Sequence, residues 1–316
     1  MKKVHKETES LLLEHEKEVL KKLEQSYARS LADIKKRIKE LMIEIDMLEK
    51  ADVENKSLIR SKIYQLNYQK SLSKQINATM DILGQNNINS VETFLKLMYE
   101  DGFLTQLYVI ESFGIPVALP INVKKMLKAV NMKVDGFKFS KRLYDDIEEL
   151  AKATIQEISR GIAQGKSYIE IAQGISKLSE ANLKHAYTIA RTEGGRVSSL
   201  AKIDSQKEAK KKGADIIKIW DSTWDGKTRP EHKALDQQKR EIDEPFEIDG
   251  YKAQAPRLFG VAYLDVNCRC TSLTVPRWDV TDTVMKRDGE SDEIVEAKNY
   301  NDWKKKYYEK IQGEKL

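Results

Sequence analysis

The stretch from Arg191 to Arg196 reads Arg-Thr-Glu-Gly-Gly-Arg and lies inside a helix that the sequence predicts from Ser179 to about Lys212, closed by Gly213. Two adjacent glycines inside a helix cost about 1 kcal/mol each relative to alanine. That cost predicts the close approach of another segment at this point. The stretch therefore indicates a long helix that is packed against another part of the chain around the double glycine.

The spacing around the double glycine defines two helical faces. Arg191, the glycines and Ser198 share one face, and Glu193 and Arg196 are spaced to form an ion pair on another. Two interpretations remain open. One is a structural notch in which Arg191 or Glu193 holds a loop in place, and the other is a functional pocket around Arg191.

The sequence after this helix is rich in β-formers. Ile216–Trp220, Val261–Leu264 and Thr271–Val275 predict short strands. The segment Ser222–Pro256 is expected to be mostly loop, with a short helix that begins at Pro230. The C-terminal half is therefore expected to place a long helix against a small β-sheet, and the fold class is α+β.

The N-terminal part predicts a helical hairpin with a coiled-coil seam. Apolar residues follow steps of three and four at Leu20, Leu23, Tyr27, Leu31, Ile34, Ile38, Leu41, Ile45 and Leu48. The helix is expected to break near Asp52–Ser57, and a second helical run is expected to end at Gly84. Two interpretations of this arm remain open: a self-contained coiled coil, or a docking arm for another subunit, including a second copy of the chain.

Further helices are predicted at Asn89–Phe113, Asn122–Val130 and Ser140–Ile162. Gly165–Ser167 resembles a helix stop and an N-cap that lead into a helix at Tyr168–Leu178. The expected organisation is a hairpin arm (1–83), a helical linker region (84–164), a C-terminal domain (165–278) and a charged tail with a helix at Asn301–Ile311 (279–316).

Composition excludes several classes of protein. The net charge of +5, from 55 basic and 50 acidic residues, is mild for a dedicated nucleic-acid binder. No apolar run approaches the roughly 20 residues that a membrane span needs, and the N-terminus lacks an apolar signal segment. The two cysteines are separated by one residue and cannot form a disulfide framework. Folding in a reducing cytoplasm is therefore expected.

A group of uncommon residues lies between Trp220 and Cys270. Asp225 opens a turn directly after a strand, Arg229 follows in a loop, and His232 falls on the predicted short helix. Cys268 and Cys270 are two residues apart, so that both sulfurs can face one partner.

His232, Cys268 and Cys270 offer soft ligands for zinc, with Asp225 or water as the fourth ligand. The alternative is that the cysteines are apolar fillers of a sheet and that His232 hydrogen-bonds a neighbouring strand. A catalytic thiolate beside His232 is a third interpretation. No other cofactor is expected. A separate interpretation assigns phosphate contacts with DNA to Lys210, Lys211, Lys212 and Arg229.

The order of these residues resembles the phage Mu protein F, or head morphogenesis, family over about residues 165–277. The residues that carry the resemblance are Arg191, Glu193, Trp220, Asp225, Thr228, Arg229, His232, Leu235, Asp236, Phe246, Asn267, Cys268, Arg269 and Cys270. Gln237 departs from the pattern, because the family usually has glycine after Leu-Asp.

The resemblance implies a minor capsid protein of a tailed phage or prophage. Such a protein contacts the portal and other capsid proteins, aids head assembly and genome packaging or delivery, and resides in the virion inside the head near the portal, after assembly in the host cytoplasm. Family members can carry toxin domains as extensions. The alternatives are a DNA-binding protein that accompanies the genome on ejection and a toxin-like enzyme built on Arg191, Glu193 and His232.

Overall fold

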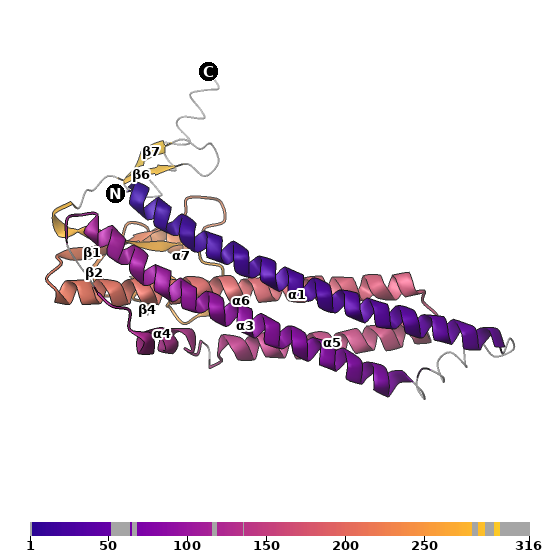
Figure 1. Cartoon of the computed structure of the whole chain (residues 1–316). Coiled ribbons are helices and arrows are strands. Elements are labelled where there is room, and N and C mark those ends of the chain that lie inside the picture. Colours follow the sequence, from indigo (N-terminus) through magenta and orange to yellow (C-terminus); the bar gives the residue numbers. More distant parts are fainter. Residues whose placement is uncertain are drawn as a thin grey trace, which may run out of the picture. The chain divides into compact units, whose positions relative to one another are not determined.

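The structure is a computed structural model that describes residues 2–51, 64, 68–115, 119–134, 136–279, 284–287 and 294–297 (Figure 1). The helices are α1 (Lys2–Ala51), α3 (Gln69–Glu111), α4 (Val123–Val130), α5 (Phe139–Ala163), α6 (Tyr168–Lys211), α7 (Pro230–Leu235) and α8 (Ala262–Asp265), with a 3-10 turn η2 (Arg277–Asp279). The strands are β1 (Ile216–Asp221), β2 (Lys239–Glu241), β3 (Phe246–Ile248), β4 (Tyr251–Ala253), β5 (Thr271–Pro276), β6 (Val284–Arg287) and β7 (Ile294–Ala297). Long helices with a small antiparallel sheet confirm the α+β class.

The chain forms two compact units. One contains residues Met1–His15, Leu95–Asp135 and Arg191–Leu316, and the other contains Glu16–Phe94 and Gly136–Ala190. Helices α1, α3 and α6 each contribute residues to both units. We call the first the sheet unit and the second the helical unit. The segment boundaries expected at 83, 164 and 278 remain predictions.

The helical unit contains an antiparallel helix pair. Thr79 donates a hydrogen bond to Asp33 at 2.8 Å, and Arg37 donates to Gln75 at 2.9 Å. The partner's number falls from 79 to 75 as the α1 number rises from 33 to 37, so the two helices run in opposite directions. This pairing confirms the predicted hairpin. Six of the nine predicted seam positions are buried in the chain's own helical unit: Leu23, Tyr27, Ile34, Ile38, Leu41 and Ile45. Leu20 and Leu31 are partly buried, and the last position, Leu48, is 42% exposed.

Two predicted helix ends are wrong. Helix α3 continues through Gly84, because this glycine lies against α5: a Cβ added at Gly84 would meet the Ile147 side chain at 3.7 Å. Helix α6 is continuous from Tyr168, and Ser179 is buried within it. The N-cap prediction is confirmed, since the backbone N–H and the hydroxyl of Ser167 both donate to Glu170. The break predicted at 52–57 lies outside the described residues.

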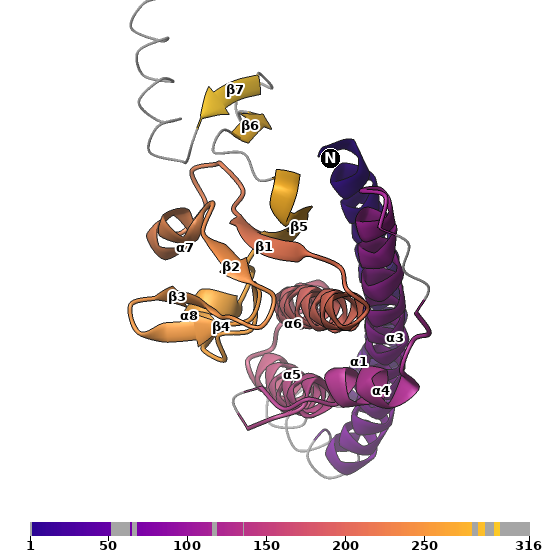
Figure 2. The ribbon, with the colours of Figure 1, turned by 90° about the vertical axis from the view of Figure 1, so that its left-hand side faces the viewer.

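The sheet unit contains the three-stranded antiparallel sheet β2-β1-β5, with Lys218 of β1 opposite Arg240 and Thr274. Figure 2 shows this sheet beside the C-terminal part of α6. Gln206 of α6 donates a hydrogen bond to Thr274 at 2.6 Å, and Lys202 donates to Thr271 at 3.2 Å. The arrangement of a long helix on a small sheet is therefore as predicted. Strands β3 and β4 form a separate hairpin, as do β6 and β7.

The strand predicted at Val261–Leu264 is wrong, because this segment forms helix α8. The Asp265 carboxylate accepts the backbone N–H groups of Phe259 at 3.1 Å and Gly260 at 2.7 Å, which folds the chain into a turn before the helix. Gly260 adopts φ 78°, a conformation that an extended strand does not contain. The helix predicted at Asn301–Ile311 lies outside the described residues. Among the described helices, none is both long enough and apolar enough to cross a membrane.

Candidate functional site

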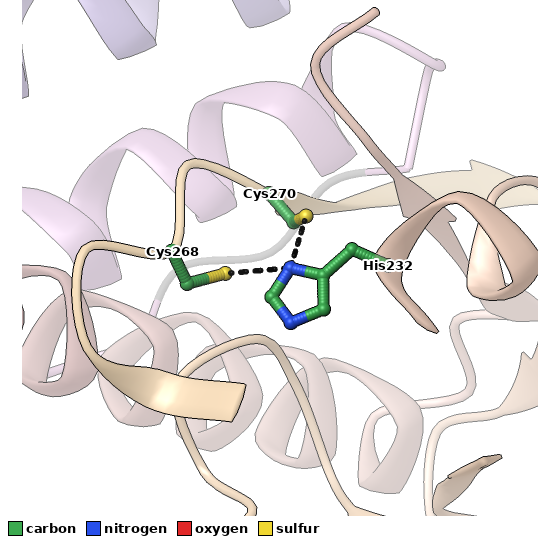
Figure 3. A group of neighbouring side chains, drawn as sticks. All are labelled: His232, Cys268 and Cys270. Carbon is green, nitrogen blue, oxygen red and sulfur yellow. Dashed lines mark hydrogen bonds between the residues drawn. The ribbon is translucent and has the colours of Figure 1, made fainter. Parts of the chain in front are cut away.

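A buried group of His232, Cys268 and Cys270 lies at the centre of the motif residues (Figure 3). His232 Nδ1 is 3.6 Å from Cys268 Sγ and 3.3 Å from Cys270 Sγ. The three side chains are 2%, 4% and 2% exposed, respectively. The expectation that both sulfurs face one partner is confirmed, although residues 267–270 are a connecting segment and not a strand.

Hydrogen bonds around Ser222 and Asp236 fix helix α7, which carries His232. The Ser222 hydroxyl donates to the His232 carbonyl at 2.5 Å, and the Ser222 N–H donates to Asp236 at 2.8 Å. The other Asp236 oxygen accepts the indole N–H of Trp224 at 2.8 Å. The Trp220 indole meets the His232 ring edge-on, with the ring centroids 5.9 Å apart. The imidazole is therefore held in place by its helix and by packing.

Three arginines hold the segment that carries the cysteines. Arg229 donates to the carbonyls of Leu264 and Val266, and Arg257 donates to the Cys270 carbonyl at 3.4 Å. These contacts satisfy backbone acceptors of a segment without regular structure. The guanidinium of Arg229, a candidate for phosphate binding, is thus engaged in the fold.

The third arginine, Arg269, forms a two-pronged ion pair with Asp225, in which Nη2 lies 2.7 Å from Oδ1. Asp225 also accepts the N–H of Lys227 at 2.9 Å and the hydroxyl of Thr228 at 3.1 Å. The Arg269 guanidinium holds the pKa of the Asp225 carboxyl well below its usual range. Of the two alternatives for a fourth zinc ligand, Asp225 or water, the structure disfavours Asp225, because its oxygens are already bound and it lies outside the group of donors.

The two thiols affect each other's protonation. The neighbouring Cys270 thiol, with help from His232 and Arg257, lowers the pKa of Cys268. Cys268 and burial raise the pKa of Cys270. The two thiols are therefore electrostatically coupled, and their pKa values move in opposite directions.

The double glycine of α6 faces a packed side chain, as predicted. A Cβ on Gly195 would lie 2.5 Å from Cζ of Arg257, so any larger residue requires the arginine side chain to move. Glu193 and Arg196 form the expected ion pair at 2.6 Å and are almost fully buried, at 1% and 3% exposed. Arg191, in contrast, is exposed. These positions favour the structural notch over a pocket around Arg191.

Arg196 also joins α6 to the end of α4. Its guanidinium donates to the carbonyl of Ala129 at 3.0 Å, in the last turn of α4. This carbonyl also accepts the backbone N–H groups of Asn131 and Met132, so Arg196 adds a charged donor to the C-terminal cap of α4. The motif residue Glu193 thus orients the arginine that fixes a neighbouring helix.

The lysines at the end of α6 are largely paired. Lys210 lies 2.7 Å from Asp243, and Lys211 lies 3.0 Å from Glu208. Lys212 is exposed. The positive charge expected to meet DNA is thus offset by two carboxylates.

Sequence reasoning missed Lys218. It is fully buried in β1, and its ammonium donates to the Ile242 carbonyl at 3.0 Å and to both oxygens of Gln254 at 2.9 Å. Burial lowers its pKa to about 8. Both faces of β1 are buried, because Ile217 and Ile219 are buried as well as Ile216 and Trp220. The signal in the sequence was the apolar run around Lys218, which is typical of a strand buried on both faces.

Gln237, the departure from the family pattern, adopts φ 65°. Its N–H donates to the Trp220 carbonyl at 2.8 Å, which joins the end of α7 to β1. The left-handed conformation is the one that glycine adopts without strain. The turn therefore forms with glutamine at the position where the family usually has glycine.

The class of this region follows from comparison with known proteins. Residues 153–273 match the model of the family described as Phage Mu protein F like protein. The region is therefore a Mu protein F-like domain, and the resemblance drawn from its motifs is confirmed.

Two curated relatives extend the similarity beyond this domain. The NAD(+)–arginine ADP-ribosyltransferase EFV of Enterococcus faecalis is 36% identical over 305 residues, which cover 96% of this chain but only 60% of that protein. Minor head protein GP7 of Bacillus phage SPP1 is 27% identical over 286 residues, which cover 85% of this chain and 88% of GP7. No solved structure matches the chain at a significant level.

Proposed function

We propose that this chain is a minor head protein of a tailed phage or prophage, that it binds the portal inside the head, and that it aids head assembly and genome packaging or delivery. The observation that carries the proposal is the Mu protein F-like domain at 153–273, together with an alignment to a minor head protein along most of both chains. Assembly would take place in the host cytoplasm.

An exposed apolar stripe on α3 supports the docking part of this proposal. Leu97, Leu104 and Tyr108 are 37%, 44% and 51% exposed and lie at spacings of seven and four residues, on one face of the helix. Single exposed apolar residues are ordinary, but several on one helix face are typical of an interaction surface. On this face the partly exposed Asp101 lies between Leu97 and Leu104. We propose that this stripe in the sheet unit contacts the portal.

Copurification with the portal ring tests docking. The double variant Leu104→Lys, Tyr108→Lys is expected to reduce recovery with the portal at least about tenfold, since charges at the centre of an apolar contact must be desolvated. Ile169→Lys, which changes a side chain 63% exposed on α6, is the matched control and should bind normally. Normal recovery of the double variant would exclude this stripe as the docking surface, and a wild-type chain that never binds the portal would contradict the docking proposal.

Deletion of the arm 1–83 is a poor test of docking. Leu23, Ile38 and Ile76 in this segment are fully buried in the helical unit. Their removal would expose the core and impair folding. Surface substitutions separate docking from folding more cleanly.

We also propose that the chain is not itself a transferase. The name of the enterococcal relative assigns ADP-ribosyltransferase activity to that protein, of which about two fifths lies outside the match. The matched part is shared with a minor head protein. The simplest account places the transferase activity in the unmatched part. Incubation of the purified chain with NAD+ and an arginine acceptor should give no ADP-ribosylated product, and product formation would contradict this account.

DNA binding during ejection is the second candidate function. Its electrostatic support is limited, because Lys210 and Lys211 pair with carboxylates and Arg229 donates to carbonyls. The affinity for nonspecific duplex DNA should therefore be weak and fall little with salt. A steep salt dependence whose log–log slope falls by about one in Lys212→Ala would instead favour the DNA-binding function.

A further inference from the structure

The donor atoms of His232, Cys268 and Cys270 lie within 4.8 Å of one another in the interior of the sheet unit. We propose that this group binds a structural Zn²⁺ ion through His232 Nδ1 and the two thiolates. The inference goes beyond the proposed function and does not depend on it.

The distances fit a tetrahedral zinc ion. Bonds of about 2.3 Å to sulfur and about 2.0–2.1 Å to nitrogen separate these donors by about 3.6 Å. The observed separations between His232 Nδ1 and the sulfurs are 3.6 Å for Cys268 and 3.3 Å for Cys270. A shared ion is compatible with both.

Hydrogen bonding alone accounts for the arrangement less well. Two sulfurs approach Nδ1 of His232, whereas one ring nitrogen makes one well-aligned hydrogen bond in either tautomer. The Cys270 thiol also lies 3.6 Å from the Ser222 hydroxyl, which accounts for one thiol proton but not for the approach of both sulfurs to Nδ1. Nε2 of the same ring is buried and has no hydrogen-bond partner among the described residues. Among the described residues, the polar contacts of this imidazole are therefore made by Nδ1, on the side of the ring where both sulfurs lie.

Charge balance favours the metal. The site lies against the apolar side chains of Trp220, Leu235 and Phe246, where an unpaired charge is costly. Binding of Zn²⁺ releases the two thiol protons to solvent, and the two thiolates neutralise the ion. The resulting centre carries no net charge.

The supporting contacts place the ligands before the metal binds. Ser222 holds the backbone of His232, while Arg229 and Arg257 hold the segment that contains both cysteines. Within the described part of the chain, the group contains three His, Cys, Asp or Glu ligands, and the fourth ligand is expected to be a water molecule. The low exposure of all three ligands indicates a structural centre that links α7 to the segment before β5.

Metal analysis of the reduced, full-length protein tests the proposal. The wild type, purified from zinc-supplemented cultures, should contain about one zinc ion per chain, and Cys268→Ser and Cys270→Ser should each contain less than about a tenth of that amount. His232→Asn should also lose the metal. His185→Asn, which alters an exposed histidine of the helical unit, is the matched control and should retain it.

Cobalt substitution provides a readout on the wild type alone, in case the variants fail to fold. Co²⁺ added to the chelator-treated chain should give the intense visible bands of a tetrahedral ion and a thiolate charge-transfer band, and Zn²⁺ should abolish them. Chelation should lower the melting temperature, and zinc should restore it. A folded wild-type chain with no stoichiometric zinc and no cobalt bands would overturn the proposal.

Discussion

The side chain of Arg257 lies across Gly195, at the point where α6 has no side chain of its own. A Cβ at this position would lie 2.5 Å from the Arg257 guanidinium carbon. The same guanidinium donates to the carbonyl of Cys270, so the glycine in the helix supports the segment that carries the cysteines. Packing of this arginine is what offsets the cost of a glycine inside the helix.

Gly195→Ala should therefore destabilise the chain, although alanine favours helix by about 1 kcal/mol. The added methyl must displace Arg257, and overpacking of this kind costs about 1–3 kcal/mol. Gly84→Ala is the matched control, because its Cβ would meet Ile147 at an ordinary 3.7 Å. Urea unfolding should show Gly84→Ala unchanged or more stable. If Gly195→Ala were as stable as Gly84→Ala, the added methyl group at Gly195 would not disturb the packing of Arg257.

The ion pair of Glu193 and Arg196 should respond strongly to the loss of one partner. Arg196→Met leaves a carboxylate that is 1% exposed without its cation and should cost about 3–5 kcal/mol. The double variant Glu193→Leu, Arg196→Met should recover part of this loss, because no charge is then buried. Lys152→Met, which breaks the exposed pair with Glu148, should leave the free energy of unfolding nearly unchanged. If Arg196→Met and Lys152→Met changed the free energy of unfolding equally, burial of the Glu193–Arg196 pair would not matter for stability.

Gln237→Gly should stabilise the turn after α7. The residue adopts φ 65°, a left-handed conformation that costs a non-glycine residue about 1–2 kcal/mol. Part of the gain is offset by the greater freedom of glycine in the unfolded chain, so the expected increase is roughly 0.5–1 kcal/mol. Gln238→Gly, at a neighbouring position without positive φ, should instead be neutral or destabilising. Thermal unfolding of both variants measures the difference.

The pair of Asp225 and Arg269 predicts a pH dependence. The arginine depresses the pKa of Asp225 in the folded chain, so its stabilising effect is fully present above the unfolded value of about 3.9 and is lost as the pH falls below it. Asp225→Asn should lower stability by about 1 kcal/mol at pH 7, since the pair is partly exposed. The difference from the wild type should shrink below about pH 4. A difference that stays constant down to pH 3 would show that the charge of Asp225 is not what stabilises the loop.

The parts of the fold that the sequence predicted well depend on local chemistry. Ser167 and Glu170 form a capping box, Asn122 caps α4, and Gly213 ends α6 with φ 95°. The spacing of Glu193 and Arg196 on one helix indicated their ion pair. In each case the interacting groups lie within a few residues of one another.

The parts that could not be predicted depend on contacts between distant segments. Nothing near Gly195 in the sequence indicates Arg257, and nothing near Asp225 indicates that Arg269 occupies its carboxylate. The segment 261–264 has the composition of a strand, but the Asp265 carboxylate caps a turn there and a helix forms. Three-dimensional packing decided these features, and composition alone was ambiguous.

Mass spectrometry of purified heads tests most directly whether this chain is a minor head protein. Heads assembled from the phage or prophage that encodes this chain should contain it, and heads from the Leu104→Lys, Tyr108→Lys variant should contain far less while the Ile169→Lys control retains it. Absence of the wild-type chain from heads that otherwise assemble normally would contradict its assignment as a minor head protein.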